Sequence, residues 1–394
     1  MTTARRLVLL GGGHAHLAVL ADMARSPWTG WDITLVSPLP HLMYSGMVPG
    51  LIAGHYRPED CRIALAPLAR AAGVRWRQAR CTGIDAGRRE VRLVDTPDTP
   101  DSAGATAQDV LGYELLSIDT GGVMDADLLE ARMPGASRHA LAVRPIEGLV
   151  DGWARAVQRL QQHHPHGASV AVIGSGAAGI ELVFAARQGL AQAGLAGVRL
   201  SLLTGGGPVA AGYPAGVRRR LQRQLRQQRI TVLPVPCTGV DDGAVHMGTA
   251  GSLVCQLALL ATGSGAPAWL QGSGLALGPQ GHVATNRFLQ STSHPDVLAA
   301  GDVADRADHR YPRSGVHAVR AGPPLAMNLR RAATGQALQA YWPPQVTLNL
   351  LSCGTGHAVA SWGPLSAAGA WVWRWKDRID RAFVARHHRP QQPS

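Results

Sequence analysis

The sequence has almost no lysine. Lys376 is the only one among 38 lysine and arginine residues, which leaves 37 arginines. Long apolar runs are also missing, because no stretch approaches the roughly 18 uncharged apolar residues of a membrane-spanning helix. The apolar run at residues 7–10 is too short for the core of a signal peptide. These absences argue against a membrane-spanning protein and favour a cytoplasmic location.

Closely spaced cysteines are missing as well. Five cysteines are present, and no two of them form a C-x-x-C pair. A local redox dithiol or a metal site is therefore not expected, and the odd count argues against a secreted disulfide framework.

Acidic residues are outnumbered, since 26 Asp and Glu stand against 38 Lys and Arg, for a formal net charge of +12. This balance suits polyanionic cofactors or an anionic membrane surface. It would also suit nucleic acid, but the sequence contains no basic-plus-aromatic RNA motif and no zinc-finger spacing. No nucleic-acid partner is expected.

Glycine, in contrast, marks the same local pattern twice. An apolar run breaks into glycine at residues 11–13, and a second apolar run breaks at residues 174–176. Each continues as a helical stretch, which is the strand–turn–helix context of a dinucleotide fingerprint. The glycines allow a sharp turn, so that a pyrophosphate can approach the helix N-terminus. Two such turns predict two dinucleotides held face to face.

Further motifs follow in a recognisable order. They are Asp-Thr-Gly at 119–121, the second glycine turn with Glu181, Ala-Thr-Gly at 261–263 and Ala-Ala-Gly-Asp at 299–302. With this order the chain resembles the FAD-dependent pyridine nucleotide–disulfide oxidoreductase superfamily over nearly its whole length. Segments 44–50, 315–320 and 362–366 are most similar to the type II NADH dehydrogenase branch. They are closer still to the NADH-dehydrogenase-like domain found fused to selenide, water dikinase.

The resemblance implies an FAD-dependent NAD(P)H oxidoreductase of the α/β class, with two Rossmann-like dinucleotide-binding domains. The FAD-binding domain would comprise residues 1–145 and 264–335, interrupted by an NAD(P)H-binding domain at 146–263. Residues 336–394 would form a small C-terminal segment.

The resemblance also assigns binding residues. Asp302 would accept hydrogen bonds from FAD ribityl hydroxyls, and the helix start at Ala318 would face the flavin ring. The FAD set is Gly11, Gly12, Gly13, His14, Ala15, His16, Ser37, Pro38, Cys81, Thr120, Gly121, Gly301, Asp302, Ala318 and Val319. The nicotinamide dinucleotide set is Gly174, Ser175, Gly176, Gly179, Thr204 and Gly263.

Three positions depart from the family pattern. His16 stands where the first turn prefers a third glycine, and we expect it to pack against the strand. Ser37 stands where a carboxylate usually binds the adenosine ribose of FAD. Thr204 stands at the matching position of the second unit, so the choice between NADH and NADPH stays open. His14 is either an acid/base group near the flavin or simply part of the turn, and the second reading is favoured.

Four residues are predicted to act in the reaction. Glu181 would orient the nicotinamide, while Tyr44, Met47 and Arg320 would line the acceptor site. Glu181 could instead be a solvated helix residue, and Tyr44 and Met47 could be core residues. Segment 44–50 has no cysteine, so thiol–disulfide catalysis is not expected, and a quinone-like acceptor is the first choice.

Two other functions stay open at this point. One is oxidation of a sulfur or selenium compound, with Cys353 taking part. The other is a redox sensor that binds FAD and NAD without turnover.

The C-terminal residues 371–389 form an amphipathic, basic helix. One face carries Trp371, Trp375, Ile379, Ala382 and Phe383, and arginines crowd the other. Such a helix suits peripheral attachment to the inner membrane surface. It also suits packing on the core or across a homodimer, and packing is the favoured prediction.

Overall fold

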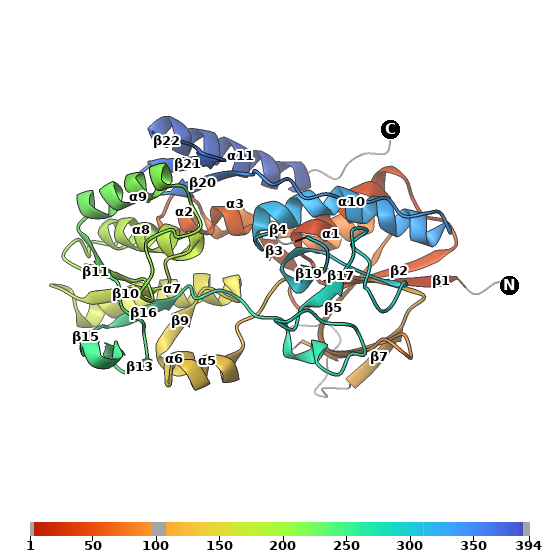
Figure 1. The fold of residues 1–394 in the computed structure, drawn as a ribbon, viewed down its shortest axis with the longest axis horizontal. Coiled ribbons are helices and arrows are strands. Elements are labelled where there is room, and N and C mark those ends of the chain that lie inside the picture. The colour runs from red at the N-terminus through yellow and green to blue at the C-terminus, as the bar shows by residue number, and fades with distance from the viewer. Residues whose placement is uncertain (1–3, 97–107, 310, 389–394) are drawn as a thin grey trace.

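The computed structural model describes residues 4–96, 108–309 and 311–388. Two lobes lie side by side, and the C-terminal segment crosses over both (Figure 1). Residues 389–394, the end of the predicted C-terminal segment, lie outside the described residues.

The first lobe is built on a seven-stranded sheet of order β18-β8-β1-β2-β5-β6-β7. Its strands are β1 Arg5–Leu10, β2 Trp31–Ser37, β5 Arg75–Asp85, β6 Glu90–Asp95, β7 Gln108–Gly112, β8 Leu115–Ile118 and β18 Val297–Ala299. The strands from β18 to β5 pair in parallel, whereas β6 and β7 pair antiparallel. Strand β8 is buried throughout, as expected of a parallel strand covered on both faces. Helices α1 His14–Arg25 and α10 Gly315–Ala333 pack against each other on this sheet.

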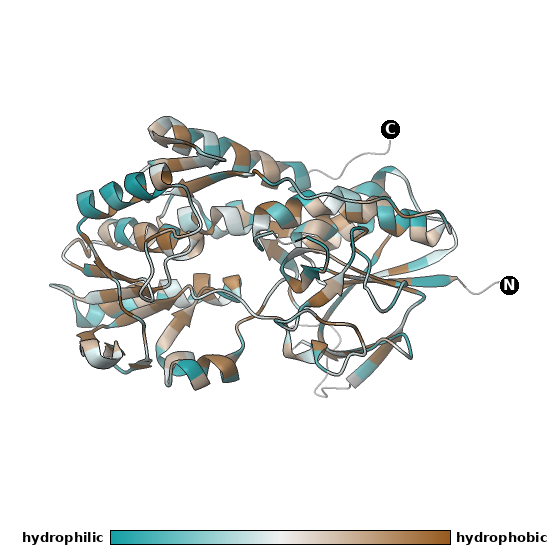
Figure 2. Cartoon of the chain, viewed as in Figure 1, coloured by the Kyte–Doolittle hydropathy of each residue, from teal (hydrophilic) through white to brown (hydrophobic). Residues whose placement is uncertain are grey.

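The second lobe is built on a five-stranded parallel sheet of order β12-β11-β10-β16-β9. Its strands are β9 Ala140–Ala142, β10 Ser169–Ile173, β11 Arg199–Leu203, β12 Ile230–Leu233 and β16 Leu257–Leu260. Its helices are α7 Ile146–His163, α8 Ala177–Gln192 and α9 Ala215–Gln227. Helix α9 buries Val217, Leu221 and Leu225, which are spaced four residues apart and so lie on one side of the helix. Its outer turns are hydrophilic (Figure 2), so the arginines of α9 form a solvated face.

Shorter strands and helices lie between these elements. The strands are β3 His41–Met43, β4 Arg62–Ala64, β13 Gly239–Asp241, β14 Ala244–His246, β15 Ser252–Val254, β17 Val283–Thr285 and β19 Ala304–Arg306. The helices are η1 Ser45–Met47, α2 Val48–Ile52, α3 Pro58–Cys61, α4 Leu65–Ala71, α5 Ala126–Arg132, α6 Ala136–His139, η2 Gly248–Ala250, η3 Ala268–Leu270 and η4 Gly301–Val303.

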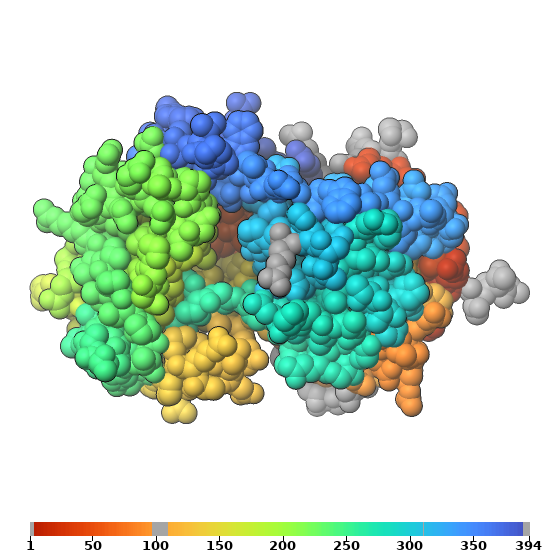
Figure 3. Space-filling view, in the orientation of Figure 1, coloured from red at the N-terminus to blue at the C-terminus, as the bar shows by residue number. Residues whose placement is uncertain are grey.

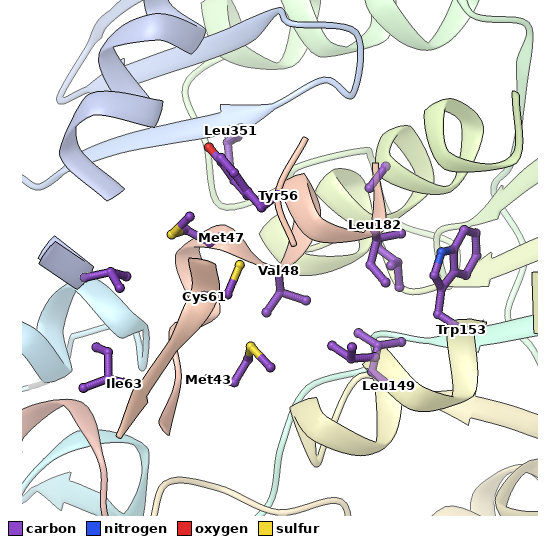
Figure 4. Close-up of a cluster of buried hydrophobic side chains, with 14 of the residues drawn as sticks. Met43, Met47, Val48, Tyr56, Cys61, Ile63, Leu149, Trp153, Leu182 and Leu351 are labelled. Atoms are coloured by element: carbon purple, nitrogen blue, oxygen red, sulfur yellow. The ribbon is translucent and has the colours of Figure 1, made fainter. Parts of the chain in front are cut away.

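The irregular segment at residues 41–63 lies between the lobes, and its side chains join them. Tyr56 from this segment lies beside Leu351 of the C-terminal segment, and Leu182 of α8 lies between the segment and Trp153 of α7 (Figure 4). One continuous hydrophobic cluster therefore includes residues of both lobes. Because Met47 is 1% exposed inside this cluster, the structure places it as a core residue.

The C-terminal segment contains a three-stranded sheet and the long helix α11. Their bounds are β20 Leu348–Ser352, β21 Ala358–Trp362, β22 Leu365–Gly369 and α11 Ala370–His388. The space-filling view shows this segment resting on the second lobe and reaching the first (Figure 3). Within the described ranges, no helix is long and apolar enough to cross a membrane.

Helix α11 does not pack through the face that the sequence favoured. Trp371, Trp375 and Ile379 are exposed by 52%, 41% and 41%, so these three side chains do not pack on the core, whereas packing across a homodimer stays a prediction. The buried side instead includes Val372, Lys376 and Asp380, together with Phe383, which does pack as predicted. A count of apolar residues missed this orientation because the inward stripe contains a lysine and an aspartate that neutralise each other.

Candidate active site

The two glycine turns have the same construction. Gly11 has φ +99° and Gly174 has φ +116°, a region that favours glycine. A Cβ added at Gly11 would overlap the carbonyl oxygen of Asp119, and one at Gly174 would overlap that of Ala261. Each turn therefore lies tightly against the end of a neighbouring parallel strand and leads directly into α1 or α8.

The second turn leaves room for a phosphate group at the start of α8. Gly176 is the N-terminal cap of α8, and a Cβ added there would have no atom within 4 Å. Ser175 donates from Oγ to the carbonyl of Thr204 at 3.5 Å, so these predicted residues lie together. Gly263, after β16, also faces open space, while Gly179 packs against the carbonyl of Gly174. The donor-rich helix N-terminus and the open space fit a dinucleotide pyrophosphate.

The first turn is organised around Asp119, whose role the sequence analysis missed. A Cβ added at Gly13 or Gly301 would meet the Asp119 carboxylate. This carboxylate accepts a hydrogen bond of 2.9 Å from the backbone N–H of His16, in the first turn of α1, and another from the N–H of Ala15. Burial raises the pKa of Asp119 to about 8. The predicted residues Gly11, Gly13 and Gly301 thus surround one buried carboxyl group.

His16 is a structural residue. Its ring nitrogens lie 2.6 Å from the carbonyl oxygen of Gly11 and 2.8 Å from Ser117 Oγ. Because a carbonyl only accepts, Nδ1 carries the proton and Nε2 accepts from the serine hydroxyl. Burial lowers the pKa of His16 to about 4, so the ring is neutral at neutral pH. It joins helix to strand where the family pattern has glycine, in agreement with the expected packing.

Asp302 has a charged partner that the sequence analysis did not name. Arg144 Nη2 donates to Asp302 Oδ2 at 2.8 Å, and the two side chains are 32% and 12% exposed. Arg144 lies between β9 and α7 of the second lobe, whereas Asp302 follows β18 of the first, so the ion pair joins the two lobes. Its charge also acts on His14, at the start of α1. A cation at this position suits the negative charge of a dinucleotide phosphate. Arg144 belongs to none of the sequence motifs, which is why the sequence analysis did not find it.

The remaining predicted FAD residues lie around the same sheet edge. Ser37 is buried at the end of β2, and its hydroxyl donates to the carbonyl of Leu39. Pro38 follows it, and Cys81 lies on β5, where its thiol hydrogen-bonds the carbonyl of Gly83. Gly12 packs beside Ser37 Oγ.

The first turns of α10 carry three predicted residues, Ala318, Val319 and Arg320, in different surroundings. Ala318 is buried against Gly301, and Val319 faces α1 across a hollow. Arg320, in contrast, is exposed, and its charge acts on His317 and Tyr341. Thr120 and Gly121 follow β8 near Arg144. Arg320 therefore lies outside the group formed by the other predicted catalytic residues.

Tyr44 and Glu181 do come together, around the single lysine of the chain. Lys376 Nζ donates to Asp380 and to the carbonyl of Gly46, each at 2.7 Å. The hydroxyl of Tyr44 hydrogen-bonds Asp380, and the charge of Glu181 acts on Lys376. We call Tyr44, Glu181, Lys376 and Asp380 the lysine cluster. It connects the segment next to the first turn, helix α8 and helix α11.

The pKa values of Glu181, Asp380 and Lys376 are all raised within the lysine cluster. Burial raises the pKa of Glu181 and of Asp380, although Lys376 opposes both shifts. Burial alone would lower the pKa of Lys376, but Glu181 and Asp380 outweigh it and raise that pKa. Glu181 Oε1 also accepts from the backbone N–H of Ser352 at 2.8 Å. One ammonium and two carboxyl groups with raised pKa values can hold and release a proton.

An apolar hollow begins beside this cluster. Its volume is about 290 Å³, and it lies between α1, α4, α10 and the end of α11. Phe383 lines the hollow and stacks on Tyr44, with ring centroids 4.4 Å apart. His14 lines it too; burial, followed by the charge of Arg144, lowers its pKa to about 4. His14 Nε2 is buried and has no hydrogen-bond partner among the described residues.

Cys353 gives no support to a thiol mechanism. It is 0% exposed at the end of β20, and burial, reinforced by the charge of Glu181, raises its pKa. A thiolate is therefore disfavoured there. In the described part of the chain, no group of three or more His, Cys, Asp or Glu could hold a metal ion.

Comparison with known proteins places this geometry in a family. The model of the pyridine nucleotide-disulphide oxidoreductase family matches residues 5–322. The chain belongs to this family. It is an oxidoreductase that uses FAD and a nicotinamide dinucleotide. The predicted family, fold class and cofactors are therefore confirmed. The two glycine turns described above fit these two dinucleotides.

Individual members of the family and related structures cover almost the whole chain. Demethylphylloquinone reductase NdbB of Synechocystis is 24% identical over 374 residues, which cover 92% of this chain and 88% of the relative. NDH2 of Plasmodium falciparum, solved with NADH, superposes with a TM-score of 0.80 at 14% identity and covers 97% of both chains. Sulfide:quinone oxidoreductase of Aquifex aeolicus has a TM-score of 0.79 at 16% identity and covers 98% of this chain and 92% of its own. The two structures show the shared fold.

Proposed function

We propose that the chain transfers electrons from NADH or NADPH through FAD to a quinone that carries an apolar side chain. FAD, when bound at the first turn, supplies the redox chemistry by taking a hydride from the nicotinamide at N5 and passing electrons to the acceptor. The protein's part is orientation, because hydride transfer between two stacked rings needs no covalent protein catalyst. The names of two relatives, a demethylphylloquinone reductase and a sulfide:quinone oxidoreductase, are compatible with a quinone acceptor.

We assign binding of the two dinucleotides to the two turns. Asp302 and Arg144 would hold FAD together with the first turn, because they offer a carboxylate for hydroxyl groups and a cation for phosphates. The second turn would hold the nicotinamide dinucleotide, with Glu181 towards its nicotinamide end. The predicted domains, 1–145 with 264–335 and 146–263, remain part of this proposal. Strand β9, at residues 140–142, already pairs in the second sheet.

The lysine cluster would supply the missing proton. Reduction of a quinone to a quinol takes two electrons and two protons, whereas a hydride brings two electrons and one proton. The second proton must come from solvent through the protein. Lys376 and Asp380 are 12% and 6% exposed, and Tyr44 extends the cluster to the wall of the hollow. The Tyr44 hydroxyl would deliver the proton, and Asp380, whose pKa is raised, would replace it. Lys376, whose pKa is raised too, would keep its charge and hold Asp380 in place.

The Tyr44–Phe383 stack is the observation that carries the proposal. Phe383 contacts the apolar hollow on one side and Tyr44 on the other, so proton donors and an apolar binding site share one wall. Between His14 and Arg25 the hollow follows α1 for about 17 Å, at 1.5 Å per residue. A hollow of this length, lined mainly by apolar side chains with Asp22 and Arg25 at one end, suits a prenyl chain better than a small polar acceptor.

The exposed face of α11 would bring the enzyme to its acceptor. Trp371, Trp375 and Ile379 project outward, and Trp362 pairs with Leu365 on the adjacent hairpin, both also exposed. Exposed arginines flank them at positions 374 and 378. Tryptophan and arginine together are typical of helices that lie on an anionic membrane surface, where prenylated quinones dissolve. We therefore include peripheral attachment to such a surface in the proposal, in preference to a homodimer contact.

Anaerobic stopped-flow spectroscopy tests the function. The purified yellow protein is reduced with NADH or NADPH and then mixed with prenylated quinone, short-chain quinone, disulfide, polysulfide or oxygen. We expect flavin absorbance to recover fastest with the prenylated quinone. Recovery no faster with any quinone than with oxygen or polysulfide would overturn the proposal.

A further inference from the structure

A second hollow lies at the outer end of the second lobe, where β11 and β15 are found in Figure 1. Its volume is about 680 Å³, and its lining includes Ser169 and Arg199, the first residues of β10 and β11. Both strands run from this edge towards the opposite one, where Gly174 begins the nucleotide turn. The hollow is therefore separate from the dinucleotide site.

Three arginines line this hollow without a counter-charge. Arg187 of α8 donates from Nη1 to the carbonyl of Val198 at 2.9 Å. Arg199 donates from Nε and Nη2 to Ser169 Oγ at 3.3 and 3.2 Å. Arg229 precedes β12 and has φ +54°. In residues 4–96, 108–309 and 311–388, none of the three forms an ion pair with a carboxylate.

Arg187 and Arg229 are close enough to repel each other. Burial, reinforced by the charge of Arg229, lowers the pKa of Arg187. Arg187 Nε is itself buried and lacks a hydrogen-bond partner within the described ranges. An anion in the hollow would cancel this repulsion and could accept from the unused N–H group. Nothing in the proposed electron transfer requires three unneutralised cations at this edge.

We propose that this hollow is a binding site for a phosphate-bearing anion, independent of FAD and of the nicotinamide dinucleotide. Planar guanidinium groups match the oxygens of phosphate in pairs, which favours phosphate over a simple halide. Ser252, from β15, adds a hydroxyl to the lining. The volume falls within the roughly 300–1,000 Å³ typical of small-molecule sites, so it admits a pyrophosphate group.

Calorimetric titration tests the proposal on the FAD-loaded protein. Saturating NAD⁺ fills the second turn, and about 0.15 M NaCl screens diffuse attraction. Inorganic phosphate and pyrophosphate are titrated separately, and saturable binding of either supports the site. The affinity should fall about tenfold or more in the double variant Arg199→Gln, Arg229→Gln, because charge-assisted hydrogen bonds are lost. Amide hydrogen exchange at residues 196–201 should slow when the anion binds.

A matched variant keeps the test specific. Arg219→Gln with Arg223→Gln removes the same charge from the exposed face of α9, and it should leave the affinity unchanged. The proposal fails if no saturable binding occurs, or if both double variants weaken it equally. It also fails if exchange slows at residues 174–179 rather than at the arginine edge. Because NAD⁺ and FAD stay bound throughout, these outcomes do not depend on the electron acceptor.

Discussion

Lys376 and Asp380 form an ion pair of 2.7 Å on the inner side of α11, one helical turn apart. The pair links α11 to the first lobe, because Lys376 also donates to the carbonyl of Gly46 and Asp380 accepts from Tyr44. The only lysine of the chain thus holds in place the carboxyl group from which the proposed path takes its proton.

Replacement of Lys376 separates its charge from its geometry. Lys376→Arg keeps the cation, but a planar guanidinium does not reproduce the two hydrogen bonds of the ammonium to Asp380 and to the carbonyl of Gly46, so quinone turnover should fall about tenfold. Flavin reduction by NADH should stay near the wild-type rate, and stopped-flow measurement of each half-reaction shows the difference. Arg378→Gln, one turn away on the exposed face, is the control. Full quinone turnover in Lys376→Arg would refute the positioning role. Lys376→Met should also lose about 3–5 kcal/mol of stability, because Asp380 is left unpaired.

Arg144→Gln should weaken FAD binding about tenfold, since it removes a charge-assisted hydrogen bond to Asp302 and a cation near the phosphates. Titration of the apoprotein, followed by flavin fluorescence, measures this loss. The exposed Arg138→Gln provides a charge-matched comparison. Equal FAD affinity in wild type and Arg144→Gln would show that the arginine serves only the joint between the lobes.

His16 should make stability depend on pH. Its folded pKa of about 4 lies below the ordinary value near 6.5, so the unfolded chain binds more protons between these values. The contribution of His16 is therefore complete above pH 6.5 and is lost as the pH falls towards 4. His16→Gln should cost about 2 kcal/mol at pH 7, through lost hydrogen bonds, and less at pH 5. Chemical denaturation at both values measures the gap, and a gap that widens in acid would contradict the assignment.

Ala21→Phe should obstruct the apolar hollow beside α1. We expect the KM for a long-chain prenylated quinone to rise about tenfold, while the KM for a short-chain quinone changes little, because only the chain needs the channel. Steady-state assays with the two quinones provide the comparison within one variant. A parallel rise for both would mean that the substitution disturbs the headgroup site instead.

The tryptophan face predicts attachment to anionic lipid. Wild-type protein should sediment with anionic vesicles at low salt, and Trp371→Ser with Trp375→Ser should reduce this partition about tenfold. Val254→Ser, which alters an even more exposed apolar side chain on β15, should have no effect. Binding that survives the double tryptophan change would remove α11 from the attachment surface.

The fold could be predicted because its signals are local. Gly11 and Gly174 each terminate a buried strand and open a helix, and that pattern alone located both lobes. Leu221 and its neighbours on α9 likewise followed the ordinary helical period. Such features can be predicted without knowing which residues, distant in the sequence, contact each other in the fold.

The parts of the site that could not be predicted depend on contacts between residues far apart in the sequence. Arg144 carries no motif, and its importance arises only because the chain brings it to Asp302, 158 residues further on. The orientation of α11 was misread because Lys376 and Asp380 are buried through partners on other elements. For Met47 the sequence left the acceptor site and the core equally open, and only the folded chain shows the residue buried within the hydrophobic cluster.

The two sides of α11 also link attachment to a membrane surface with the proposed catalytic step. The helix is 19 residues long and carries Lys376 inward and its exposed tryptophans outward. A rigid rod that tilts at one side tilts at the other, so a surface pulling on the tryptophans would shift the contact between Lys376 and Gly46. Recruitment and catalysis would then report on each other, and the same polypeptide would turn over at different speeds in free solution and on a vesicle.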